Sequence, residues 1–146
     1  MREVTRGLLL ASVLLLAACG GQAWQDHRGN DLHAADLEGK WTVINYWAEW
    51  CAPCREEIPE LNALDGVSED IRVLGIHFDA YQGDELRKLS DQMGIAFPVM
   101  GHDFAAAKGL ALPQVLPTTY IIDPSGQLVH SLQGPQDEAS LLALMQ

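Results

Sequence analysis

Positive charge is scarce in this chain. Its 146 residues include 9 lysines and arginines against 20 aspartates and glutamates, and the formal net charge at pH 7 is −11. A protein that binds a nucleic-acid backbone or an anionic membrane surface through charge needs a basic patch. The composition therefore predicts no nucleic-acid partner. Internal repeats and low-complexity tracts are also missing, which favours one compact domain.

Long apolar runs are missing as well. Residues 7–16 form an apolar run broken only by Ser12, shorter than the stretch of about 20 residues that spans a bilayer as a helix. Arg2 and Arg6 precede this run, and two alanines follow it. A basic start, an apolar core and small residues at the end are typical of a secretory signal peptide. We therefore predict that residues 1–18 are a signal peptide outside the fold.

The residues around Cys19 give this signal a more specific form. Leu-Ala-Ala-Cys at residues 16–19 matches the lipobox of bacterial lipoproteins, in which the cysteine sulfur is lipidated and the cysteine becomes the new N-terminus. We therefore expect a lipid anchor at Cys19, a tether over residues 19–23 and one domain over residues 24–146. The alternative is an ordinary signal peptide followed by an incidental cysteine.

Cysteine is limited to three residues. If Cys19 is lipidated, Cys51 and Cys54 remain as the one pair. A disulfide across two intervening residues adds little stability, because stabilisation by loop closure grows with loop length. A zinc site with four ligands is disfavoured, since a second cysteine pair is absent. The pair therefore indicates redox chemistry.

Hydrophobic periodicity predicts a mixed β-sheet with helices on both faces. Strands are expected at residues 41–47, 71–78, 97–100, 118–122 and 128–132, and helices at residues 51–64, 103–109 and 137–146. A further helix is expected between Asp84 as its cap and Gly94 as its end. Residues 24–32, with Gly29-Asn30 at their centre, suggest a small hairpin. The expected fold class is α/β.

The cysteine pair lies where the first long strand passes into a helix, in the sequence Trp50-Cys51-Ala52-Pro53-Cys54. The first turn of a helix has unpaired N–H groups and a positive partial charge, so it stabilises a thiolate. A spacing of three residues places the second sulfur one turn further along. Pro53 suits a first turn, because its missing N–H would be unpaired there. We predict that Cys51 is the exposed nucleophile and Cys54 the buried resolving thiol.

Residues 43–59 are similar to the active-site segment of thioredoxins, and the wider pattern resembles the TlpA/ResA-like family. These proteins are exported reductases tethered to membranes, some of which serve cytochrome c maturation. The resemblance spans residues 24–146 and rests on Gly39-Lys40, Asn45, Glu57-Ile58-Pro59, Phe97-Pro98, Leu116-Pro117-Thr118-Thr119 and Asp123–Gly126. It implies a thioredoxin-like fold and a thiol–disulfide oxidoreductase that needs no cofactor. It also implies disulfide-bearing exported substrates, an upstream membrane or extracytoplasmic thiol reductant, and a lipid-anchored location on the periplasmic side of the cell envelope.

The resemblance also assigns roles to single residues. Pro117 matches the cis-proline that packs beside the disulfide and leaves the preceding backbone free to pair with substrate. Glu57 matches an acidic residue that handles the proton of the buried thiol, although it could instead be a solvated helix glutamate. Asn45 stands where thioredoxins have a buried aspartate, and an amide cannot accept that proton. Trp50 and Pro53 are expected to support the site.

Glu49 bears on the direction of electron flow. Its negative charge near Cys51 opposes the helix dipole, and Arg55 is expected to offset it in part. A less stabilised thiolate favours a reductase.

A copper chaperone is the main alternative, with Cys51, Cys54 and His77 as soft ligands of Cu(I). We rank it second because the cysteine spacing and the adjacent proline do not suit a metal, and we predict no metal site. A peroxidase would need a cysteine loop that carries proline and threonine, which we do not find. The remaining histidines are expected at the surface (His27, His33 and His130) or, for His102, at a strand end.

Overall fold

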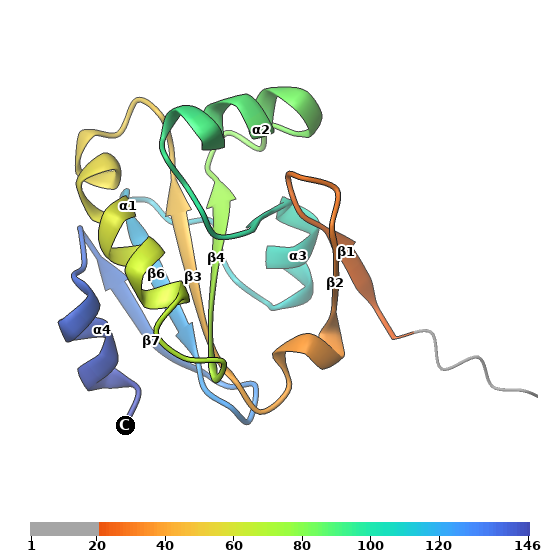
Figure 1. Cartoon of the computed structure of the whole chain (residues 1–146), viewed down its shortest axis with the longest axis vertical. Helices are drawn as coiled ribbons and strands as arrows, with labels where there is room; N and C mark the ends of the chain where they lie inside the picture. The colour runs from red at the N-terminus through yellow and green to blue at the C-terminus, as the bar shows by residue number, and fades with distance from the viewer. Residues whose placement is uncertain (1–20) are drawn as a thin grey trace, which may run out of the picture.

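A five-stranded mixed sheet forms the centre of the computed structural model, which describes residues 21–146 (Figure 1). The strand order is β5-β4-β3-β6-β7. The central strand β3 (Trp41–Trp47) pairs in parallel with β4 (Ile71–His77) and antiparallel with β6 (Thr118–Ile122). The edge strands are β5 (Val99–Met100) beside β4 and β7 (Leu128–Gln133) beside β6. The predicted mixed sheet is confirmed.

Helices cover both faces of the sheet. Figure 1 shows α1 (Ala52–Asp65) and α4 (Glu138–Leu144) on one side and α3 (His102–Ala107) on the other. The helix α2 (Gly83–Gln92) follows β4, and its Leu86 packs into the core beneath α1. The α/β fold class predicted from the sequence is therefore observed.

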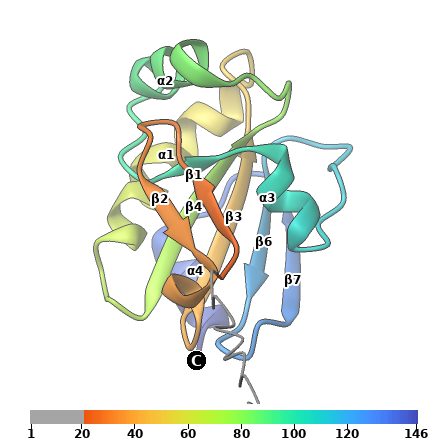
Figure 2. The same cartoon turned by 90° about the vertical axis from the view of Figure 1, so that its right-hand side faces the viewer.

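The chain enters the fold through a small hairpin. Strand β1 (Ala23–Gln25) pairs antiparallel with β2 (Asp31–His33), as the glycine and asparagine between them predicted. A short 3-10 helix, η1 (Ala34–Leu37), then leads to β3. Figure 2, turned by 90°, shows the hairpin and α3 in front of the sheet, with α1 and α4 behind it.

Side chains of β3 alternate between two apolar cores. Val43 and Trp47 belong to the core under α1 and α4, whereas Ile44 and Tyr46 belong to the core under α3 and the hairpin. Such alternation is expected of a strand buried on both faces. The Trp47 ring packs closely over Gly75 of β4. Any larger residue would crowd it, since a Cβ at position 75 would lie 3.0 Å from Trp47 Nε1.

Several predicted element ends differ from the structure, among them those of α2 and β5. Gln82, not Asp84, is the N-cap of α2, so Asp84 lies in the first turn, where its carboxylate pairs with Arg87. The predicted strand at residues 97–100 is paired only at Val99 and Met100. Gly94, at a φ of +71°, follows α2 as predicted.

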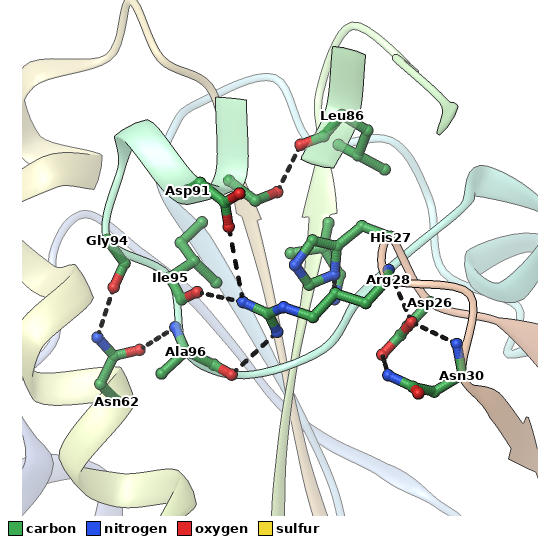
Figure 3. A network of polar contacts seen from close by, with 12 residues as sticks. Asp26, His27, Arg28, Asn30, Asn62, Leu86, Asp91, Gly94, Ile95 and Ala96 are labelled. Atoms are coloured by element: carbon green, nitrogen blue, oxygen red, sulfur yellow. Dashed lines mark hydrogen bonds and ion pairs between the residues drawn. The ribbon is translucent and has the colours of Figure 1, made fainter. Parts of the chain in front are cut away.

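His27 was predicted at the surface, and this was wrong, because it is 7% exposed and joins the hairpin to the edge of the sheet. Its backbone N–H donates to the Val99 carbonyl over 2.8 Å, and its Nδ1 accepts the Val99 N–H over 3.0 Å. The next residue, Arg28, donates from its guanidinium to the carbonyls of Ile95 and Ala96, as Figure 3 shows. Together these contacts cover the open edge of β5.

The N-terminal predictions lie outside the described residues. They are the signal peptide at residues 1–18 and the lipid site at Cys19. Within residues 21–146, no helix combines the length and the apolar character that a bilayer crossing requires.

Candidate active site

Cys51 and Cys54 form a disulfide at the start of α1. Their Cα atoms lie 5.3 Å apart, and the Cys51 sulfur accepts the backbone N–H of Cys54 over 3.3 Å. Cys51 is the N-cap of the helix, and Pro53 occupies its first turn, where a proline costs no hydrogen bond. The Cys51 sulfur therefore lies at the N-terminus of a helix, the position that stabilises a thiolate.

The two cysteines differ in exposure, although less than predicted. Cys54 is fully buried, and Cys51 is 5% exposed. In the disulfide state Cys51 is thus the more accessible of the two residues, but it is not exposed. Trp50, directly before it, is 60% exposed. An exposed aromatic ring therefore stands next in sequence to the less buried cysteine.

Glu57 lies one turn beyond Cys54 and is 1% exposed, so the alternative of a solvated helix glutamate was wrong. Burial raises the pKa of Glu57 to about 7, because the charged carboxylate is poorly solvated there. Two hydrogen bonds act in the opposite direction: the Gln136 N–H donates to Oε2 over 3.0 Å, and Asn45 Nδ2 donates to Oε1 over 2.5 Å. A carboxyl group with a pKa near 7 can both accept and release a proton at neutral pH.

Asn45 links Glu57 to the centre of the sheet. It is fully buried on β3, and its Nδ2 also donates to Thr119 Oγ1 of β6 over 3.1 Å. Its Oδ1 has no hydrogen-bond partner among the described residues. An amide has a donor end and an acceptor end, so after a flip of the amide its Oδ1 can accept a hydrogen bond from the O–H of a neutral Glu57, which keeps its proton. Asn45 therefore suits both protonation states of Glu57.

Pro117 follows a cis peptide bond, as the resemblance to the thioredoxin family implied. Leu116, before it, packs against the apolar core that contains Cys51 and Cys54. The Pro117 carbonyl accepts the Gly134 N–H, whereas the N–H and C=O of Leu116 form no hydrogen bond within residues 21–146. Within residues 21–146, the backbone of Leu116 before the cis bond therefore keeps one donor and one acceptor free.

The end of β4 contributes residues that the sequence did not identify. Asp79 Oδ2 accepts the Trp50 indole N–H over 2.8 Å, and His77 Nε2 lies 2.8 Å from Glu49 Oε2. Arg55, whose charge was expected to offset that of Glu49 in part, donates to the Glu49 backbone carbonyl. Asp79 and Gln136 lie far from the cysteines in sequence and belong to no motif, so only the fold could reveal them.

His77 does not complete a copper site with the cysteines. Its Nδ1 accepts the Asp79 backbone N–H over 3.1 Å, and its Nε2 faces Glu49. A neutral imidazole has one lone pair, and that pair is already engaged. The arrangement gives no support to the copper chaperone alternative. Glu49, His77 and Asp79 also lie close together, with ligand atoms within 4.8 Å of one another, but the lone pair of His77 is engaged there in the same way.

Known proteins share these features. Residues 20–131 match the family described as the AhpC/TSA family. The thiol-disulfide oxidoreductase ResA of Bacillus thuringiensis (strain Al Hakam) is 32% identical over 120 residues, which are 80% of this chain and 68% of the relative. The thiol:disulfide interchange protein HelX of Rhodobacter capsulatus is 32% identical over 106 residues, which are 71% of this chain and 58% of HelX.

A solved structure agrees with these relatives. The crystal structure of a thiol:disulfide interchange protein of the thioredoxin family from Chlorobium tepidum TLS matches with a TM-score of 0.69 and 28% identity, covering 82% of this chain and 87% of that chain. The fold, the cysteine pair and the relatives agree on one chemistry. The chain therefore belongs to the AhpC/TSA family and, within it, to the TlpA/ResA-like thioredoxin group of thiol–disulfide oxidoreductases.

Proposed function

We propose that this protein reduces disulfides of exported proteins, with Cys51 as the attacking thiolate and Cys54 as the resolving thiol. The observation that carries the proposal is the Cys51–Cys54 disulfide at the N-terminus of α1, one turn before the buried Glu57. A helix start stabilises a thiolate, and the thiolate is the form that attacks a disulfide.

The cycle transfers two electrons to the substrate. In the reduced protein, the Cys51 thiolate attacks one sulfur of the substrate disulfide, and the other substrate sulfur leaves as a thiolate that takes a proton from solvent. Cys54 then attacks the Cys51 sulfur and breaks the mixed disulfide, which releases the second substrate thiolate. The substrate leaves as a dithiol, and the protein is left with the Cys51–Cys54 disulfide. An upstream dithiol protein in the membrane or the extracytoplasmic space reduces it again.

Glu57 is the proposed base for the second step. Cys54 is fully buried, so its thiol loses a proton only with difficulty unless an acceptor lies nearby. A Glu57 pKa of about 7 suits the transfer of that proton in either direction. Asn45 then holds Glu57 in both protonation states.

Pro117 and Trp50 are the proposed contacts for substrate. The free N–H and C=O of Leu116, next to the cis bond, can pair with an extended substrate segment as an added strand. The exposed Trp50 ring offers an apolar surface beside Cys51. Pro53 sets the first turn of the helix between the two sulfurs.

The proposed location is the periplasmic side of the cell envelope, with the chain lipid-anchored at Cys19. The lipobox at residues 16–19 supports this, together with a signal peptide at residues 1–18, a tether at residues 19–23 and a domain at residues 24–146. Acyl chains on Cys19 suffice for stable anchoring, at about 0.8 kcal/mol per buried methylene. Some TlpA/ResA-like proteins serve cytochrome c maturation, which makes apocytochromes c one substrate class to test.

The experiment that tests these roles is covalent trapping. Cys54→Ala should hold substrates on Cys51 as mixed disulfides, which a non-reducing gel separates and mass spectrometry identifies. Cys51→Ala serves as the control and should trap nothing, because Cys54 is buried. Equal trapping by both variants, or trapping only by Cys51→Ala, would contradict the assigned roles. Reduction of trapped partners by the wild-type chain checks the direction of electron flow.

A further inference from the structure

Residues at the end of β4 form hydrogen bonds to the turn that contains Trp50 and Cys51. Phe78, just beyond the end of β4, donates its backbone N–H to the Trp47 carbonyl over 2.9 Å. His77 Nε2 lies 2.8 Å from Glu49 Oε2, and Asp79 accepts the indole N–H of Trp50 over 2.8 Å. Three consecutive residues of one segment therefore bind the segment immediately before the cysteine pair.

The His77 ring is fixed in one orientation. Because Nδ1 accepts the Asp79 backbone N–H, the proton of the neutral ring lies on Nε2, which donates to Glu49. The ring is 1% exposed, and it packs edge-on against Trp47 at 4.7 Å and tilted against Tyr81 at 4.9 Å between centroids. His77 is thus a buried, oriented donor whose acceptor lies two residues before Cys51.

The side chain of Trp50 is also held in one orientation, by contacts with Phe78 and Asp79. Its side chain is 60% exposed, yet its indole N–H is bound to a carboxylate and its ring lies edge-on to Phe78 at 6.1 Å. An exposed tryptophan without such contacts samples several rotamers and loses that freedom when a partner binds. Here the rotamer is selected before binding.

We propose that His77 and Asp79 are positioning residues, which hold the turn at residues 48–51 so that Trp50 and the Cys51 sulfur meet a substrate in a fixed geometry. The proposal rests on the proposed role of Cys51 in disulfide reduction. Neither residue takes part in the transfer of electrons. Each acts through its hydrogen bond on the residue that faces the substrate.

The two hydrogen-bonded pairs are His77 with Glu49 and Asp79 with Trp50. The test replaces Glu49 and Asp79, because His77 is buried and its replacement could also disturb folding. Glu49→Ala and Asp79→Ala each remove one acceptor, whereas Glu49→Gln and Asp79→Asn keep an acceptor oxygen. Asp84→Ala, which removes an exposed carboxylate on α2, is the matched control. The full-length chain is assayed for kcat and KM with insulin as the disulfide substrate and with excess dithiothreitol, which reduces the Cys51–Cys54 disulfide again after each turnover.

We expect each alanine variant to lower kcat/KM by about tenfold, the effect of one lost orienting hydrogen bond. The amide variants should remain within about twofold of the wild type, since an amide oxygen still accepts the bond. The Trp50 indole N–H resonance, identified by its loss in Trp50→Phe, should move in Asp79→Ala and not in Asp79→Asn. A purely structural role would not produce this rescue.

The outcomes separate the two proposals. If the wild-type chain reduces insulin but both alanine variants match it, the positioning role is overturned while the proposed function stands. If Glu49→Gln loses as much as Glu49→Ala, the charge of Glu49 matters and the bond from His77 does not, which also overturns it. If the reduced wild-type chain reduces neither insulin nor trapped partners, the proposed function itself fails.

Discussion

Two titratable side chains are buried in different parts of this molecule, and they serve different ends. Glu57 lies one turn beyond Cys54 on α1, with Asn45 and Gln136 as hydrogen-bond partners. His27 lies at the edge of β5, where it continues the hydrogen bonding of the sheet through Val99. Glu57 is 1% exposed and His27 is 7% exposed, so burial alone does not distinguish a residue proposed to act in the reaction from a structural one.

Their pKa values depart from the ordinary values in ways that reveal the difference. Burial raises the pKa of Glu57 to about 7 and lowers that of His27, because in both cases the neutral form is favoured. For Glu57 the result is a group that exchanges protons at neutral pH, one turn beyond Cys54, whose proton it is proposed to accept. For His27 the result is a ring that favours the neutral form, whose Nδ1 accepts a backbone N–H. Burial therefore indicates function when the shift brings the pKa toward working pH beside a reacting atom.

The largest expected effect is the loss of reaction rate when Glu57 is replaced. Glu57→Gln should slow release of the reduced substrate from the mixed disulfide by about 100-fold, the usual contribution of a general base. Stopped-flow measurement with a fluorescent disulfide peptide follows this step directly. Glu56→Gln, which changes the adjacent exposed glutamate, is the matched control and should react at the wild-type rate. A rate for Glu57→Gln within a few-fold of the wild type would exclude Glu57 as the base.

The next effect is on stability, and its sign follows from the raised pKa of Glu57. Between pH 4.5 and about 7 the folded chain keeps a proton that the unfolded chain has lost, so the free energy of unfolding falls as the pH rises. The loss is at most about 3 kcal/mol over this window. Urea unfolding of the disulfide form at several pH values should show this decrease, and Glu57→Gln should remove it. An equal slope in both proteins would show that Glu57 titrates normally.

The sequence allowed prediction of the residues around the cysteine pair and Glu57, but not of the burial of His27. The strand at residues 41–47, the cysteine pair, Glu57 and Pro117 belong to local patterns that a single segment carries. The surface prediction for His27 failed because its burial depends on Val99, far along the chain. Asp79 and Gln136 were missed for the same reason, since each reaches the site across the fold.

The third prediction concerns the contribution of His27 to the free energy of unfolding. His27→Leu should lower the free energy of unfolding by about 2 kcal/mol, because the buried Val99 N–H loses its acceptor. Turnover should not change, since His27 touches no residue of the proposed site. His27→Asn, which offers an oxygen near the position of Nδ1, should recover part of the loss. A large fall in kcat for His27→Leu would mean that the sheet edge and the disulfide are coupled.

The pH dependence of His27 sharpens the contrast. Its pKa lies below 6.5 in the folded chain, so the unfolded chain takes up a proton first as the pH falls. The stability that neutral His27 contributes is therefore present above pH 6.5 and lost below it, the opposite slope to Glu57. His27→Leu should remove the decrease on the acid side, and Glu57→Gln the decrease toward neutral pH. Unfolding of the two variants over one pH series separates the two contributions.

The smallest expected effect concerns Arg28. Its guanidinium donates to the Ile95 carbonyl over 2.9 Å and to the Ala96 carbonyl over 3.2 Å, and it lies 3.9 Å from the Asp91 carboxylate. The side chain is 36% exposed, so water can replace part of what is lost. Arg28→Met, which keeps the apolar stem, should cost about 1 kcal/mol in unfolding free energy. Asp91→Ala should cost less, because a pair at that distance near the surface is weak. If Asp91→Ala were the more damaging, the ion pair and not the two carbonyls would hold the hairpin against the segment after α2.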